Sequence, residues 1–93
     1  MYFVTTVDPK DEDTRCVGYF KTFEEAERVV INNIDDIWET CYEYAVIEKI
    51  EPGLYQYDFH PTWYKWHKLT GGYIQCEQPT FVNAIGGVGY AIG

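Results

Sequence analysis

Two short apolar segments near the start of the chain predict a β-hairpin. Residues 2–7 (YFVTTV) and 15–20 (RCVGYF) are rich in β-branched and aromatic side chains, which are typical of strands. Residues 8–14, between them, contain a proline and four acids, which is the chemistry of a turn. We therefore expect two antiparallel strands joined by a long acidic loop.

The next segment has the spacing of an amphipathic helix. Thr22 and Glu25 fit a capping box, in which the hydroxyl accepts the Glu25 backbone N–H and the carboxylate completes the reciprocal bond. Apolar side chains then recur at helical spacing from Phe23 to Val30, with charged residues between them. This pattern predicts a helix of about ten residues that packs on a sheet. Residues 34–40 (IDDIWET) fit either a further helical turn or an irregular crossing.

Further strands are expected in the second half of the chain. Residues 42–50 (YEYAVIEKI) have the clearest strand pattern, and residues 62–68 and 73–77 predict a hairpin around a Thr-Gly-Gly turn. In the first strand of this hairpin, alternation places Trp63, Lys65 and His67 on one face and Tyr64, Trp66 and Lys68 on the other. Three further segments have weaker patterns. Residues 54–59 fit a short strand or an ordered loop, and residues 81–85 are short and apolar. Residues 86–93 fit a glycine-rich turn followed by a final strand.

This order of elements predicts the fold class and the domain organisation. We expect an α+β fold, an antiparallel sheet with one amphipathic helix packed on it, in the order ββα followed by additional strands. Ninety-three residues are enough for a single domain spanning positions 1–93. The chain has no run of 18 apolar residues and no signal-peptide pattern, so we expect no membrane partner and a cytoplasmic location. Cys16, Cys41 and Cys76 are then expected to be reduced thiols.

Charge and aromatic content are distributed unevenly along this domain. The formal net charge is −8, but residues 1–58 contain fourteen of the fifteen acids, whereas residues 59–93 have one acid and two lysines. The acidity argues against direct binding to DNA or RNA backbones. Seven aromatic side chains fall between positions 55 and 73. A domain of this size buries only about 60% of its unfolded surface. Some aromatic residues are thus expected to face a ligand, solvent or another subunit of a homo-oligomer.

The near-neutral, aromatic-rich segment supplies most of the candidate ligand-binding residues. Aromatic rings interleaved with cations can stack a nucleotide base and hold its phosphate. Arginine is also a strong phosphate ligand because its guanidinium can bind two oxygens at once. The alternative is a hairpin of core and interface residues with its lysines at the solvent edge, while Arg15 pairs with the acidic loop and Arg28 with Glu24 or Glu25. The candidates are Arg15, Trp63, Lys65, Trp66, His67, Lys68 and Tyr73.

Other kinds of chemistry have weaker support. The acidic loop lacks the ligand order of an EF-hand, and His60, His67, Cys76 and Glu77 match no compact zinc motif. No Cys or His lies in a recognisable nucleophile context. The glycines at positions 86–89 indicate a turn rather than a dinucleotide fingerprint, although glycine amides can also approach a phosphate. We expect no catalytic residue, no metal and no cofactor.

The chain also resembles a set of small proteins found in phages, prophages and mobile elements of Gram-positive bacteria. The segments that carry the likeness are RCVGYF, TFEEAERVV, DIWE, YAVIEKIEPGLY, the W-Y-K-W segment and the terminal glycine-rich strand. Some small phage proteins of this size are homo-oligomeric sponges that sequester nucleotide signals of CBASS or Thoeris defence without cleaving them. The resemblance implies immune evasion, with a cyclic dinucleotide or an ADP-ribose-derived signal as the ligand.

Two other functions compete with a nucleotide sponge. The first is an acidic inhibitor that mimics nucleic-acid charge and blocks a basic protein. The second is a phosphodiesterase that uses His60 or His67 as an acid or base. The acids that would form the mimic surface are Glu24, Glu25, Glu27, Asp35, Asp36 and Glu39.

Overall fold

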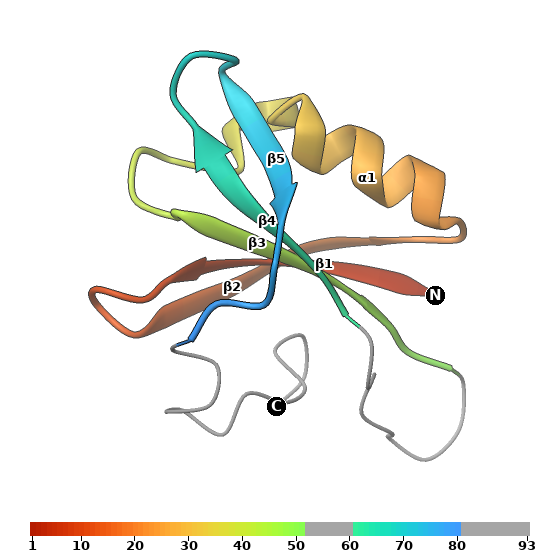
Figure 1. The fold of residues 1–93 in the computed structure, drawn as a ribbon. Coiled ribbons are helices and arrows are strands. Elements are labelled where there is room, and N and C mark those ends of the chain that lie inside the picture. Colours follow the sequence, from red (N-terminus) through yellow and green to blue (C-terminus); the bar gives the residue numbers. More distant parts are fainter. Residues whose placement is uncertain (52–60, 81–93) are drawn as a thin grey trace.

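The protein is a five-stranded antiparallel sheet with one helix packed on one face (Figure 1). The computed structural model describes residues 1–51 and 61–80. The strands lie in the order β2-β1-β3-β4-β5. The elements are β1 (Tyr2–Asp8), β2 (Asp13–Phe20), α1 (Phe23–Ile31), the 3-10 turn η1 (Ile34–Asp36), β3 (Tyr44–Lys49), β4 (Thr62–His67) and β5 (Gly72–Cys76). The predicted α+β fold class is confirmed.

Element boundaries differ slightly from those predicted. Strand β3 begins two residues later than expected, and β4 ends at His67, so Lys68 lies in the following turn. No helix within residues 1–51 and 61–80 is long and apolar enough to cross a membrane. The segments expected at 54–59, 81–85 and 86–93 lie outside the described residues, and so does His60.

The start of α1 follows the sequence prediction in part. Thr22 is the N-cap, and its hydroxyl oxygen accepts the Glu25 backbone N–H at 3.2 Å. The Glu25 carboxylate, however, accepts a hydrogen bond from the Thr22 hydroxyl at 3.0 Å. The expected reciprocal bond thus runs to the side chain of the cap, because a hydroxyl can donate and accept at the same time.

Residues 33–40 form an irregular crossing rather than a further regular helix. After η1 they continue as turns, and five of them have positive φ angles, a region that glycine adopts freely and Asn and Asp adopt more readily than other residues. These residues are Asn33 (48°), Asp35 (57°), Asp36 (54°), Glu39 (47°) and Thr40 (65°). A local conformation this unfavourable has to be held by contacts with the rest of the protein.

Alternation along the strands divides the buried side chains between the two faces of the sheet. On the helix-covered face, Ala26 and Val30 of α1 and Ile37 pack with Tyr64 and Tyr73 and with small aliphatic residues of β1 and β3. On the opposite face, Val7, Val46 and Trp63 form a second buried cluster. Each face therefore carries a buried apolar cluster. Alternation along β4 directs Tyr64 and Trp66 to the cluster under the helix and Trp63 to the opposite one.

Candidate functional site

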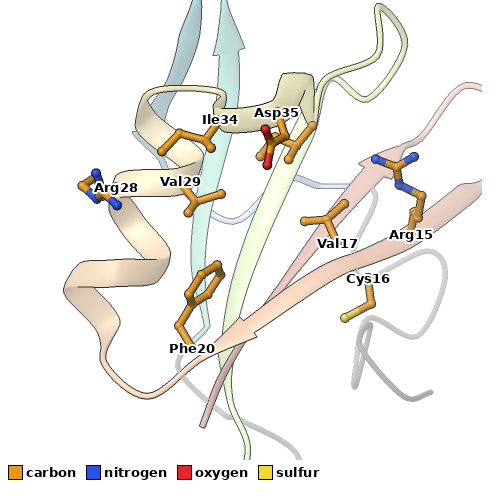
Figure 2. A pocket seen from close by; sticks show the side chains of 9 residues that line it. Arg15, Cys16, Val17, Phe20, Arg28, Val29, Ile34 and Asp35 are labelled. Atoms are coloured by element: carbon orange, nitrogen blue, oxygen red, sulfur yellow. The ribbon is translucent and has the colours of Figure 1, made fainter.

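A hollow of about 540 Å³ lies between α1, β2 and the crossing segment 33–40 (Figure 2). Ligand pockets for small molecules commonly occupy about 300–1,000 Å³, so the hollow has the size of a small-molecule site. Its apolar lining comes from Val17 and Phe20 of β2, Val29 of α1 and Ile37 of the crossing, and charged side chains complete the walls. Figure 2 shows the first three of these side chains converging on the space between the strand and the helix.

An irregularity in β2 contributes to this arrangement. Val4 pairs with Gly18, but the next residue, Thr5, pairs with Cys16, so Val17 is an extra residue in the ladder. Bulges of this kind bend a strand and redirect its side chains. Val17 packs against the helix-side core, whereas the Cys16 side chain lies on the other side of the strand (Figure 2).

The only two arginines of the chain both line this hollow. Arg15 comes from β2 and Arg28 from α1, where it stands at the outer rim (Figure 2). The Arg15 guanidinium donates to Glu39 over 2.5 Å and lies 5.5 Å from the centre of the Tyr42 ring. The hydrogen bond to Glu39 raises the pKa of Arg15, against a smaller opposing effect of burial.

These contacts correct two expectations about the arginines. Arg15 pairs with Glu39 and not with the acidic β1–β2 loop, because the crossing brings the Glu39 carboxylate within 2.5 Å of the Arg15 guanidinium. Asp13 of β2, next to that loop, instead accepts a hydrogen bond from the Tyr42 hydroxyl at 2.8 Å. Within residues 1–51 and 61–80, Arg28 forms no ion pair with Glu24 or Glu25.

The sheet separates the aromatic residues that were predicted to bind a ligand. Trp66 and Tyr73 lie on the helix-covered face, where Trp66 stacks on Trp38 with ring centres 4.0 Å apart and an angle of 7°. Tyr73 is 1% exposed and its hydroxyl donates to the Tyr42 carbonyl at 2.5 Å. Trp63 is buried in the cluster on the opposite face. These rings therefore do not form one stacking surface.

The polar members of the predicted group are also dispersed. Lys65 lies 3.9 Å from the Glu43 carboxylate and 5.8 Å from the centre of the Tyr44 ring. His67 accepts the Thr70 backbone N–H at its Nδ1 atom, and Lys68 is exposed in the turn. Arg15 is in β2, at the far side of the sheet order from β5. A role for these residues in ligand binding stays a prediction.

The predicted homo-oligomer rested on a surplus of aromatic side chains. Trp63, Tyr64 and Tyr73 are all buried within the single chain, so they do not require a second subunit. The large exposed apolar side chains are elsewhere, with Tyr19 on β2, Leu69 in the β4–β5 turn and Ile74 on β5 among them. Association between copies stays a prediction.

Sequence reasoning placed acids of the crossing segment on a possible mimic surface but missed the segment as part of a ligand pocket. Ile34, Asp35 and Ile37 line the hollow, and Glu39 reaches Arg15. The Asn and Asp residues of this segment were a partial signal, because these types tolerate left-handed backbone better than others. Nothing local indicated that Glu39 would meet a residue 24 positions away.

Two of the thiols, Cys41 and Cys76, are poorly suited to nucleophilic chemistry. Burial raises the pKa of Cys41, and the nearby carboxylates of Asp8 and Glu39 raise it further. Burial also raises the pKa of Cys76. A raised pKa keeps a thiol protonated, whereas the thiolate is the nucleophile and metal ligand. No cluster of metal-binding side chains occurs within residues 1–51 and 61–80.

Buried phenols predict a loss of stability at alkaline pH. The hydrogen bond to Asp13, together with burial, raises the pKa of Tyr42 to about 12, and burial raises the pKa of Tyr64 and Tyr73. Because the folded state holds these protons more tightly, the stabilisation is complete below about pH 10 and is lost as the pH rises toward 12. Urea unfolding at about pH 8 and about pH 11 should show this decline.

The matched variants for this measurement are Tyr42→Phe and Tyr19→Phe. Tyr42→Phe removes one of the titrating phenols, so its stability should fall less between the two pH values. Tyr19 is an exposed tyrosine, and Tyr19→Phe should retain the full decline. An equal decline in wild type and Tyr42→Phe would contradict the role of Tyr42.

No protein-family model, curated protein or solved structure matches this chain. The likeness to small phage proteins therefore stays a prediction, and the geometry of the hollow is the basis for considering what the protein binds.

Proposed function

We propose that the protein binds a small anionic nucleotide in the hollow between α1 and β2 and holds it without cleaving it. The observation that carries this proposal is that both arginines of a chain with a net charge of −8 line one hollow. The proposed ligand class is a cyclic dinucleotide or an ADP-ribose-derived signal. In a phage-encoded protein acting in the host cytoplasm, sequestering such a signal would protect the phage from bacterial defence.

The walls of the hollow suit the two parts of a nucleotide. A guanidinium binds phosphate oxygens through paired hydrogen bonds, and Arg15 lines the space from β2. Arg28 lines it from α1, with its side chain directed outward from the helix (Figure 2). Phe20, Val17 and Val29 offer an apolar surface for a base or ribose. Asp35 also lines the hollow, and the surrounding acidity disfavours long polyanions. The site therefore favours a compact ligand with few phosphates.

Binding without turnover agrees with the chemistry of the neighbouring groups. Cys16 lies beside the hollow, but its side chain is on the other side of β2 (Figure 2). The raised pKa of Cys41 keeps this thiol in its unreactive form. Among residues 1–51 and 61–80, the walls of the hollow contain no histidine to act as an acid or base.

The proposal predicts that Arg15→Met weakens nucleotide binding at least tenfold. A hydrogen bond to a charged group contributes about 1.5–3 kcal/mol, and about 1.4 kcal/mol corresponds to a factor of ten in affinity. The measurement is calorimetric titration with a panel of cyclic dinucleotides, cyclic trinucleotides and ADP-ribose derivatives. Mass spectrometry of the recovered ligand tests whether it stays intact.

Lys68→Met is the matched control, because it removes a positive charge from an exposed turn outside the hollow. It should leave nucleotide affinity unchanged. The reverse result, a loss of binding in Lys68→Met but not in Arg15→Met, would place the ligand on the β4–β5 hairpin. No binding of any nucleotide, and none released from the purified protein by heating, would contradict the proposed function itself.

The acidic surface supports a second candidate, an inhibitor of a basic protein. Five of the six acids predicted to form the mimic surface are exposed: Glu24, Glu25, Asp35, Asp36 and Glu39. The sixth, Glu27, is partly buried and accepts a hydrogen bond from the Tyr64 hydroxyl. Salt-sensitive capture of a nucleic-acid-binding host protein would favour this function over nucleotide binding.

A further inference from the structure

We propose that Glu39 is an internal counter-anion that occupies Arg15 in the ligand-free protein and must be displaced when an anionic ligand enters the hollow. This inference rests on the proposed function, because it concerns how the same site is opened. The inference adds that ligand binding is coupled to movement of the chain, because release of Glu39 from Arg15 also frees residues 38–40 of the crossing segment.

The ion pair has the geometry that such competition requires. A carboxylate oxygen of Glu39 lies 2.5 Å from a terminal nitrogen of Arg15, the position that a phosphate oxygen would take. The two side chains are 42% and 46% exposed, so solvent and solutes reach the pair. Exposed ion pairs contribute little net stability, which makes this one replaceable by an anion that binds the guanidinium through two oxygens.

Glu39 makes this contact from a strained backbone. Its φ angle is 47°, and that of the next residue, Thr40, is 65°, both in the left-handed region. Neither residue type favours this region, so the conformation persists only where surrounding contacts hold it. The bond to Arg15 is one of those contacts. Its loss therefore allows residues 39 and 40 to relax to ordinary backbone angles.

The residues that precede Glu39 in the chain limit how far the segment can move, and one of them provides a signal of that movement. Ile37 is buried in the helix-side core and anchors the segment. Trp38 lies between this anchor and Glu39 in the chain. The Trp38 backbone N–H donates to the Asn33 side chain at 3.0 Å, and the Trp38 ring stacks on Trp66. Because Trp38 is adjacent to Glu39, relaxation of the segment disturbs this stack.

The stacked tryptophans provide an optical readout of the segment. Two stacked indoles with centres 4.0 Å apart are close enough for their transitions to couple. Where the two rings are rotated in plane relative to each other, this coupling gives an exciton band in circular dichroism. The third tryptophan, Trp63, lies in the cluster on the opposite face of the sheet and is outside this pair. A loss of the exciton band therefore reports separation of Trp38 from Trp66.

The test compares Glu39→Gln with Glu43→Gln, using inorganic pyrophosphate as the probe. Both variants remove one negative charge from an exposed glutamate, but Glu43 pairs with Lys65 and not with Arg15. We expect Glu39→Gln to bind pyrophosphate at least fivefold more tightly than wild type, and Glu43→Gln to gain less than twofold. In wild type the exciton band should weaken as pyrophosphate saturates the protein, and in Glu39→Gln it should be weaker before any probe is added.

Each alternative outcome overturns the inference in a recognisable way. Equal gains in both variants would mean that only the general negative charge opposes the anion. An unchanged exciton band at saturation would mean that the segment does not move. If wild type binds nucleotides but Glu39→Gln binds pyrophosphate no better, the counter-anion role fails and the proposed function stands. If no variant binds pyrophosphate and wild type binds no nucleotide, both fail.

Discussion

Replacing Gly72 with alanine should destabilise the protein by about 3 kcal/mol or more, the upper range for forcing extra atoms into a packed interior. A Cβ atom at this position would lie 1.8 Å from the carbonyl oxygen of Ile31, the last residue of α1. The obstructing atom belongs to the backbone, so no side-chain rotation can relieve the overlap. The end of α1 would have to move away from β5, which would disturb the core that includes Val30 and Tyr73.

The neighbouring glycine is the matched control for this prediction. Gly71 has a φ angle of 70° but no heavy atom within 4 Å of an added Cβ. Gly71→Ala should therefore cost only the left-handed backbone penalty, about 1 kcal/mol. Urea unfolding of both variants, followed by circular dichroism, measures the difference. A loss in Gly72→Ala no larger than in Gly71→Ala would show that α1 does not approach β5 this closely.

Replacing Trp63 with alanine should cost about 4 kcal/mol, which is close to the whole stability of many small domains. Trp63 is 2% exposed and packs with Val7 and Val46. Its ring also meets Tyr44 edge to face, with centres 6.5 Å apart. Removing the indole leaves a large cavity in this cluster, which its neighbours can fill only in part. Thermal and urea unfolding measure the loss.

Leu69→Ala is the control, because Leu69 is 91% exposed and its truncation should change stability by less than about 0.5 kcal/mol. The comparison also addresses the binding role predicted for Trp63. Trp63→Phe keeps part of the buried ring and is the variant in which nucleotide binding should be measured. A Trp63→Ala protein that kept its stability but lost nucleotide affinity would favour the binding role over the structural one.

Local patterns were sufficient for the regular elements of the described chain. The β-branched and aromatic content of residues 2–7 and 15–20 and the alternation at residues 42–50 predicted strands, and the cap at Thr22 marked the start of α1. These signals succeed because side chains on one face recur every two residues in a strand and every three to four residues in a helix. A few neighbouring positions are therefore enough to indicate the buried face. The ends were less exact, since Lys68 lies in a turn and the first two residues of 42–50 precede β3.

The candidate site was harder to predict because adjacency along the chain is not adjacency in space. Alternation had already placed Trp63 and Trp66 on opposite faces of their strand, and the structure has each ring in a different core. A cluster of aromatic and basic residues within one hairpin therefore did not become one surface. The sequence contained the evidence for this separation, but composition alone suggested a single site.

What the sequence by itself determined is the α+β class, the helix with its cap, and the side chains available for each face of the sheet. The tertiary structure alone decided where the arginines meet their partners. Arg15 reaches Glu39 across 24 residues, Trp38 stacks on Trp66, and Gly72 lies against the end of α1. These contacts join segments that are distant in sequence, and two of them come from the irregular crossing. Periodicity carries no information about such contacts, because they depend on how the whole chain packs.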